Sequence, residues 1–337
     1  MPKKIYYKKL SEKKKILDKN RPFDKALIKN LEEWFRIELT YTSNAIEGNS
    51  LSRAETALVV EKGLTIGGKS ITEHLEAMNT ASALDFVKEQ IKRKPCDLRE
   101  KDILKIHSII LDKIDRENAG IYRRVPVRIS GSAVVLPNPR KVQDLMDNFF
   151  KWLKNETKMH AVELASEAHY RFVTIHPFID GNGRTARLLM NMILMMKGFP
   201  PAIIRKNDRL AYIKSLEKPQ LVNGEGQEKE NAKNDYFKLM ADAVDRSLNI
   251  YLKAIKGENA EPENEKLLKI GELAKATNQT VATIRHWTKE GLLQVAEITE
   301  SGYQMFSDEM VERVERIREM RERKMNLSEI KEGVKYG

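Results

Sequence analysis

The chain has 337 residues and a formal net charge of +11, with 41% hydrophobic residues and one cysteine. This length leaves room for a catalytic domain with a full core and at least one further unit. The sequence contains no run of roughly eighteen apolar residues, and its N-terminus lacks the apolar stretch of a signal peptide. We therefore expect no membrane span and no secretion by that route. Cys96 cannot form an internal disulfide, which agrees with a cytoplasmic location.

Positive charge is concentrated at the N-terminus. The first 22 residues hold nine Lys or Arg against Glu12 and Asp18, and so carry +7 of the total of +11. We interpret this stretch as a solvated, lysine-rich tail, which is the commoner role of such a terminus. Contact with an acidic partner or with nucleic acid is the alternative. The net charge alone is therefore weak evidence for nucleic-acid binding.

Residues 42–49 (TSNAIEGN) have the pattern of a helix end, with Gly48 as the residue that follows the C-terminus. On these local grounds, Glu47 is an ordinary terminal glutamate. Further along, residues 120–123 (GIYR) precede residues 125–137 (VPVRISGSAVVLP), the most β-prone part of a mainly helical sequence. Apolar residues flank Ser130-Gly131-Ser132, which predicts a surface hairpin with an open edge for strand addition.

Residues 176–187 (HPFIDGNGRTAR) combine a histidine, a carboxylate, a Gly-Asn-Gly turn and two arginines. Gly181 and Gly183 permit backbone conformations closed to residues with a Cβ atom, so successive N–H groups can converge on an anion. We predict a helix from Arg184 to Met195. The anion would then lie at a helix N-terminus, where unpaired N–H groups and the helix dipole favour negative charge.

The side chains of this motif add acid–base and metal chemistry. Arg184 and Arg187 are three residues apart and share a helix face, so they offer two charged forks to phosphate oxygens. Asp180 is a natural Mg²⁺ ligand, because that ion prefers hard oxygen donors beside phosphates. His176, with an ordinary pKa of about 6.5, can accept a hydroxyl proton near neutral pH. The alternative, a capped loop with a core histidine, is disfavoured by the length of the motif.

At these residues the chain resembles the Fic family, whose signature HPFx(D/E)GNGRxxR is matched at every specified position from His176 to Arg187. Members of that family typically transfer AMP from ATP to a Ser, Thr or Tyr hydroxyl of a protein. The resemblance implies that His176 is the general base, that Asp180 holds Mg²⁺ and that Arg187 holds the γ-phosphate. Further ATP or phosphate contacts are implied for Gly181, Asn182 with its side chain as an added donor, Gly183, Arg184, Thr185 and Ala186.

Residues 42–49 resemble the inhibitory motif of this family, (S/T)xxxE(G/N). The resemblance implies that Glu47 pairs with Arg187 in the place of the γ-phosphate, so that ATP binds in an unproductive pose. A carboxylate that already holds the guanidinium must be displaced before phosphate can use it. In some relatives the same glutamate orients a water that removes AMP, so Glu47 is also a candidate for de-adenylylation.

The resemblance also gives roles to other segments. Residues 125–137 would be the Fic flap, a hairpin that aligns the modified segment of a target protein, with Ile129, Ser130 and Gly131 as docking residues. Tyr212 and Gln220 follow the motif helix, where family members contact adenosine. Those two residues are therefore candidate contacts to the adenosine of ATP.

Residues 256–265 (KGENAEPENE) are polar and acidic without apolar periodicity, which is typical of a linker. Beyond them we predict a helix over 267–276, a turn over 277–280 and a second helix over 281–290 that ends at Gly291. With Gly302-Tyr303 and a helix over 307–324, this region resembles the MerR-type winged helix-turn-helix. The DNA-contact candidates that the resemblance implies are Thr280, Thr283, Arg285 and Lys289.

Charge does not decide what the C-terminal region binds. Residues 261–337 contain thirteen basic and fifteen acidic residues, a net charge of −2, whereas residues 266–296 contain five basic and two acidic residues. Phosphate attraction by the helix-turn-helix itself is therefore local. DNA binding and protein contact or dimerisation stay open as alternatives for this region.

We thus predict a mainly α-helical protein, a Fic-type helical bundle with a small β-hairpin flap plus a winged helix-turn-helix domain. The predicted parts are an N-terminal helical region over 1–100 with an inhibitory helix at about 40–50, a Fic core over 101–255, the linker over 256–265, and the winged helix over 266–337. The predicted function is an autoinhibited protein adenylyltransferase that uses ATP and Mg²⁺, acts on a target protein and on itself, and forms a homodimer. The alternative is a DNA-binding regulator in which the Fic domain is a nucleotide sensor or partner module. His176 favours the enzyme, because a scaffold needs no base.

Overall fold

The structure is a computed structural model that describes residues 3–94, 97–222, 226–258, 267–295, 297–299, 302–306, 309–323, 325–326 and 329–330. Cys96 and residues 259–265 of the predicted linker lie outside these ranges. The chain divides into two compact units, residues 1–260 and 261–337, and the division falls within the predicted linker. Across the residues that are described, no helix is both long and apolar enough to cross a membrane.

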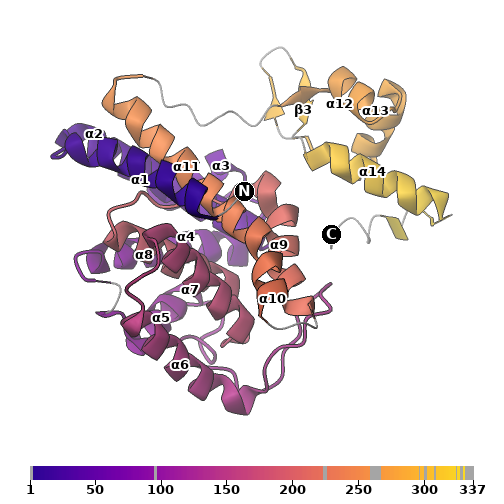
Figure 1. Ribbon diagram of the computed structural model, residues 1–337. Coiled ribbons are helices and arrows are strands. Elements are labelled where there is room, and N and C mark those ends of the chain that lie inside the picture. The colour runs from indigo at the N-terminus through magenta and orange to yellow at the C-terminus, as the bar shows by residue number, and fades with distance from the viewer. Residues whose placement is uncertain are drawn as a thin grey trace. The chain divides into compact units, whose positions relative to one another are not determined.

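The first unit consists of packed helices (Figure 1). They are α1 (Lys3–Lys19), α2 (Lys25–Ile46), α3 (Arg53–Lys62), α4 (Ile71–Gln90), α5 (Glu100–Ile110), α6 (Val142–Asn155), α7 (Ala161–Ile175), α8 (Asn182–Met196), α9 (Arg209–Leu221), α10 (Gln227–Ala232) and α11 (Asn234–Ile255), with short 3-10 turns η2 (Pro139–Lys141) and η3 (Lys206–Asp208). Side-chain caps define several starts. Asp24 accepts two backbone N–H groups at the start of α2, and Ser52 and Ser70 form capping boxes at α3 and α4.

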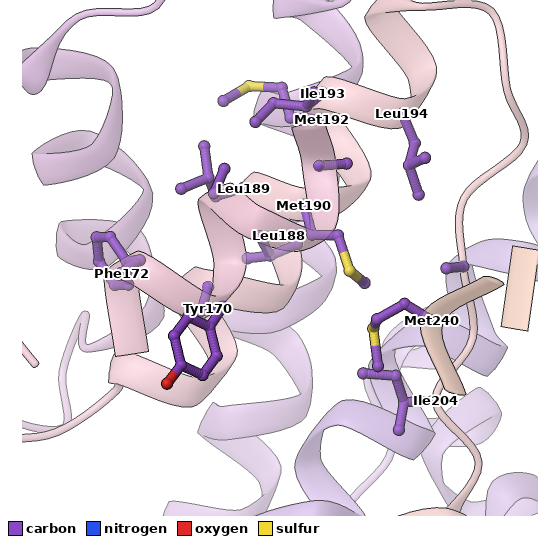
Figure 2. Close-up of a cluster of buried hydrophobic side chains, with 14 of the residues drawn as sticks. Tyr170, Phe172, Leu188, Leu189, Met190, Met192, Ile193, Leu194, Ile204 and Met240 are labelled. Carbon is purple, nitrogen blue, oxygen red and sulfur yellow. The ribbon is translucent and has the colours of Figure 1, made fainter. Parts of the chain in front are cut away.

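Helix α8 lies at the centre of this unit. From Asn182 to Leu194 every residue except Gly183 is buried, because α7, α5, α4 and α2 all pack against it. Figure 2 shows its Leu188, Leu189, Met190 and Ile193 gathered with side chains of α7 and with Met240 of α11. Full burial of each such side chain contributes about 1.5–3 kcal/mol. The helix that begins at the Gly-Asn-Gly turn is thus anchored in the core, which fixes the position of its N-terminus.

The N-terminal stretch is not the solvated tail that its charge suggested. It forms α1, which lies alongside α11 (Figure 1) and buries Tyr7, Leu10 and Leu17. Spacings of three and seven residues put these side chains on one face of a helix, while the exposed Lys8, Lys9, Lys15 and Lys19 lie on its other faces. Ion pairs from Lys9 and Lys13 to Asp245 of α11 add to the contact.

The second unit is a small helix-turn-helix with a three-stranded antiparallel sheet. Its elements are β1 (Leu268–Lys269), α12 (Ile270–Ala276), α13 (Val281–Lys289), β2 (Glu297–Ile298), β3 (Gln304–Phe306) and α14 (Glu309–Glu322). The strand order is β1-β3-β2, with Leu268 opposite Phe306 and Glu297 opposite Met305. A separate core around Leu273, Ile284, Trp287 and Phe306 holds this unit together.

The predicted hairpin over 125–137 is correct in its turn but wrong in its strands. Ser132 N–H donates to Ile129 O at 3.2 Å, and Gly131 has a φ of +75°. Nevertheless, residues 121–138 contain no strand or helix. Pro126 and Pro137 lack the N–H group that a ladder needs. The candidate flap is therefore a loop with a central turn.

Candidate active site

The loop between α7 and α8 begins and ends with a residue in the left-handed backbone conformation. His176 ends α7 with a φ of +51°, and Gly181 precedes α8 with a φ of +73°. Buried Asn182 closes the loop from within, since its Oδ1 accepts from Phe178 N–H and its Nδ2 donates to Phe178 O, each at 2.9 Å. The Asn182 side chain therefore shapes the loop, and the donation to phosphate that the resemblance implies stays a prediction. The loop presents its backbone at the N-terminus of a buried helix, as the anion site requires.

His107 of α5 contacts this loop and holds it in place. The sequence analysis did not identify this residue. Gly120 N–H donates to its Nδ1 at 2.9 Å, so Nε2 carries the proton and donates to Asp180 O, also at 2.9 Å. The ring stacks on Phe178 with centroids 3.5 Å apart. Burial lowers the pKa of His107 to about 4 and keeps the ring neutral. A Cβ atom at Gly181 would lie 3.2 Å from this ring, which explains why glycine suits that position.

His176 has the protonation state that a general base needs. Its pKa lies below the ordinary value, mainly because burial disfavours the imidazolium, and the charge of Arg123 acts in the same direction. Glu47 and Asp180 oppose this effect without reversing it. The neutral imidazole therefore prevails near neutral pH and can accept a proton.

Arg184 points its guanidinium at two carboxylates. Nη1 donates to Glu76 Oε1 at 3.0 Å, and Nη2 donates to Asp180 Oδ2 at 3.2 Å. The Arg184 side chain is buried, whereas 68% of the Asp180 side chain is exposed. Asp180 thus offers an open hard-oxygen donor beside the predicted phosphate site. No group of three or more His, Cys, Asp or Glu side chains that could hold a metal occurs among the described residues. The residues present therefore fit a Mg²⁺ ion that is held by one carboxylate, that of Asp180, together with substrate phosphates.

The guanidinium of Arg187, the last residue of the motif, is hydrogen-bonded to residues at the C-terminal end of α2. Its Nη2 donates to Glu47 Oε1 at 2.7 Å and to Ser43 O at 2.9 Å, and its Nε donates to Ser43 Oγ at 2.9 Å. Burial raises the pKa of Glu47, but the positive charges of Arg187, Arg184 and Arg209 outweigh this effect, so the pKa lies below its ordinary value. Glu47 is therefore ionised and paired with Arg187.

Residues 42–49 combine the predicted helix end with the contact between Glu47 and Arg187. Glu47 is the C-terminal cap of α2, and Gly48 follows it with a φ of +100°. The same helix end directs the Glu47 carboxylate toward the start of α8. A Cβ atom at Gly183 would lie only 2.3 Å from Glu47 Oε1 and 3.0 Å from Arg187 Nη1. Glycine at this position therefore lets the carboxylate approach the first turn of α8.

The two remaining motif positions are packed into the core. Thr185 donates its N–H to Gly181 O at 3.0 Å, and its side chain and that of Ala186 are fully buried. Any contact of these two residues with phosphate would therefore be made by backbone. Their small side chains let α8 approach its neighbours closely.

The polar groups of Tyr212 and Gln220 are already engaged, and one partner of the Tyr212 hydroxyl is the Arg187 side chain of the motif. Tyr212 is buried, and its hydroxyl lies 2.8 Å from Nε2 of His169, whose Nδ1 lies 2.9 Å from the Tyr236 hydroxyl. Gln220 Nε2 donates to Leu216 O in its own helix at 2.9 Å. The Tyr212 hydroxyl thus links a core network to Arg187, and a contact of either residue with adenosine stays a prediction.

Two structural residues of the site escaped sequence reasoning for different reasons. Arg123 lies in the noted GIYR segment, yet nothing in the sequence shows that its side chain is buried. His107 follows the spacing of Ile103, Ile106 and Ile110, a stripe that places it on the buried face of α5. That periodicity was the available signal for His107.

The DNA-contact candidates gather on α13 of the second unit. Thr280 caps this helix by accepting from Thr283 N–H at 3.1 Å, and the hydroxyls of the two threonines lie 2.8 Å apart. Thr280, Arg285 and Lys289 are exposed, and Thr283 is half-buried. Ile284 and Trp287 of the same helix face the core. One face of α13 therefore carries polar and basic side chains outward.

The helical unit thus places a glycine-containing loop, a neutral histidine and an arginine paired with Glu47 around the start of one buried helix. Residues 97–194 match the sequence model of the Fic/DOC family, and residues 268–336 match that of the MerR HTH family of regulatory proteins. The chain therefore contains a Fic domain followed by a MerR-type helix-turn-helix.

Relatives and solved structures extend the likeness beyond the motif. The proteins named protein adenylyltransferase Fic from Culex quinquefasciatus and Aedes aegypti are each 36% identical to this chain over 248 residues, which is 73% of this chain and 47% of theirs. The chain thus spans about half the length of these relatives. A Fic-domain signaling protein from Bacteroides thetaiotaomicron has a TM-score of 0.68 at 29% identity, covering 77% of this chain and 100% of that one. For Fic-1 from C. elegans the TM-score is 0.66 at 29% identity, covering 76% and 73%.

Proposed function

We propose that this protein is an autoinhibited adenylyltransferase, which transfers AMP from MgATP to a Ser, Thr or Tyr hydroxyl of a target protein. One observation carries the proposal. A neutral histidine and Gly181 lie in the loop before α8, and Arg187 of that helix is already held by Glu47 at 2.7 Å. The names of the relatives support ATP as the nucleotide and a protein as the acceptor.

The chemistry follows from the positions of these groups. The target hydroxyl oxygen bonds to the α-phosphorus as the bond from that phosphorus to the β-phosphate oxygen breaks, and pyrophosphate leaves. His176 takes the hydroxyl proton, while N–H groups at the start of α8 and Arg184 hold phosphate oxygens. Mg²⁺ at Asp180 would neutralise phosphate charge. Arg187 grips the γ-phosphate once Glu47 has left it.

Glu47 acts as the brake in this scheme. While its carboxylate holds Arg187, that guanidinium cannot orient the γ-phosphate, and ATP is placed unproductively. Removal of AMP would be a separate hydrolysis: a water oriented by Glu47 would bond to the phosphorus as the bond from that phosphorus to the target oxygen breaks, which gives AMP and the free hydroxyl. We further propose that the chain works in the cytoplasm as a homodimer and adenylylates itself as well as its target.

The experiment is incorporation of α-labelled ATP, with Mg²⁺, by Glu47→Gly and by Glu47→Gly combined with His176→Ala. Incorporation by the first variant and none by the second is expected, and γ-labelled ATP should label neither. If the first variant binds ATP but takes up no label, the adenylyltransferase proposal fails.

A second proposed function is DNA binding by the C-terminal unit. Exposed Arg285 and Lys289 of α13, with exposed Thr280 at its N-cap, support it, as does the MerR match. In this role the recognition helix enters the major groove and the basic residues contact phosphate. The test is gel retardation with a fragment of the gene's own upstream region at increasing salt. If the DNA fragment is not retarded even at low salt, this proposal is wrong.

A further inference from the structure

Arg123 is a buried side chain that the proposed chemistry leaves without a role. It is 2% exposed, and it lies just after the GIYR glycine that contacts His107. Its Nε donates to His176 O at 2.7 Å, its Nη2 to Pro137 O at 2.7 Å and its Nη1 to Val125 O at 3.3 Å. Its backbone N–H donates to Pro177 O at 2.9 Å. One residue thus contacts the catalytic loop twice and both ends of the candidate flap.

These partners require an arginine. All four described contacts are with backbone carbonyls, and burial lowers the pKa of Arg123. Burying a guanidinium whose described partners are carbonyls costs desolvation free energy, so packing alone does not explain an arginine at this position. Its planar fork can satisfy three carbonyls in fixed directions, which the single ammonium of lysine cannot do.

The connected elements have different tasks in the proposed reaction. His176 supplies the base, and it sits in a left-handed conformation that its surroundings must hold. Residues 125–137 contain no strand, so no ladder ties their two ends together. The guanidinium of Arg123 takes that place. A shift of the Val125 or Pro137 carbonyl is therefore passed to the His176 carbonyl through one rigid group.

We propose that Arg123 is a positioning residue that couples seating of the target segment on residues 125–137 to the orientation of the His176 imidazole. This inference rests on the proposed function of the loop and adds a regulation to it. The base then has its productive orientation only when the flap is held. Such coupling makes transfer depend on the presence of a protein acceptor.

The test compares Arg123→Lys and Arg123→Ala with the exposed neighbour Arg124→Lys, each in the full chain carrying Glu47→Gly. For Arg123→Lys, kcat for the protein acceptor should fall on the order of 100-fold while KM for MgATP stays within about twofold. Guanidinium ion, at concentrations too low to unfold the protein, should restore part of the activity of Arg123→Ala. Arg124→Lys should behave like its parent.

The inference is overturned if Arg123→Lys turns over like its parent, or if guanidinium fails to rescue a folded Arg123→Ala. A second measurement keeps it testable should the parent transfer no AMP, an outcome that counts against the proposed function alone. Amide exchange over residues 125–137 and the imidazole NMR signal of His176 should change together in Arg123→Lys and not in Arg124→Lys. A flap that loosens while the His176 signal is unmoved contradicts the coupling.

Discussion

Histidines around the loop differ in what their burial achieves. His107 has both ring nitrogens committed to backbone groups, and His169 lies between two tyrosine hydroxyls. Burial lowers the pKa of His107 to about 4 and that of His169 to about 3, so both stay neutral as structural groups. His176 shares the direction of the shift but lies where a substrate proton can reach it in the proposed reaction.

Because these histidines are neutral in the folded protein, we expect the free energy of unfolding to fall in mild acid. Below an unfolded pKa of about 6.5 the unfolded chain binds protons that folded His107 binds only near pH 4, so the free energy of unfolding decreases as pH falls between these values. For His107 alone the loss between about pH 7 and about pH 5 is about 2 kcal/mol. Urea unfolding of wild type and His107→Gln measures it. Equal pH slopes for the two proteins would contradict the prediction.

The lowered pKa of His176 predicts the acid limb of the rate profile. Because the base acts in its neutral form, kcat/KM of Glu47→Gly should persist below the ordinary imidazole value, with its acid midpoint under about pH 6.5. Initial rates across pH with labelled ATP provide the measurement. An acid midpoint above that value would show that His176 is not the base or is not depressed.

At the scale of elements, helix α1 shows how a charged sequence can still be part of a core. Leu10 is 1% exposed against α11, whereas Ile16 of the same helix is 51% exposed. Leu10→Ala should therefore lower the free energy of unfolding by about 2–5 kcal/mol, and Ile16→Ala by less than about 0.5 kcal/mol. Chemical denaturation of both variants checks this difference. Similar losses for the two would mean that α1 does not dock through this face.

How far the sequence predicts an element depends on the range of the forces that form it. The loop and α8 could be predicted, because glycine conformations and an uninterrupted run of helix formers act locally; α8 begins at Asn182, close to the predicted Arg184. The prediction of strands in the flap was wrong, because a strand ladder also depends on pairing partners elsewhere in the fold. The two ends of residues 125–137 are held by Arg123 instead. Pairing of Glu47 with Arg187 was accessible only through family resemblance, since 140 residues separate them.

At the scale of the whole molecule, the two units have separate hydrophobic cores. The first is centred on α8, and the second on residues such as Trp287, Ile284 and Phe306. Neither of these clusters includes residues of the other unit. We therefore expect catalysis and DNA binding to be separable by mutation.

Trp287→Ala tests this separation. Trp287 is 2% exposed, so its truncation should cost about 3–5 kcal/mol and unfold the small second unit. DNA retardation should disappear, while label incorporation by the Glu47→Gly form stays at its parent's rate. Val281→Ala, at a residue 37% exposed on the same helix, serves as the control. Loss of AMP transfer together with DNA binding would contradict the separation.

If Glu47 restrains the proposed transfer by holding Arg187, Glu47→Gln should relieve that restraint with almost no change of shape. A charge-assisted hydrogen bond contributes about 1.5–3 kcal/mol, which corresponds to roughly 10- to 150-fold in rate. The measurement is the initial rate of AMP incorporation by wild type, Glu47→Gln and the exposed control Glu61→Gln. We expect a rise of that size for Glu47→Gln alone. Equal rates for all three proteins would contradict it.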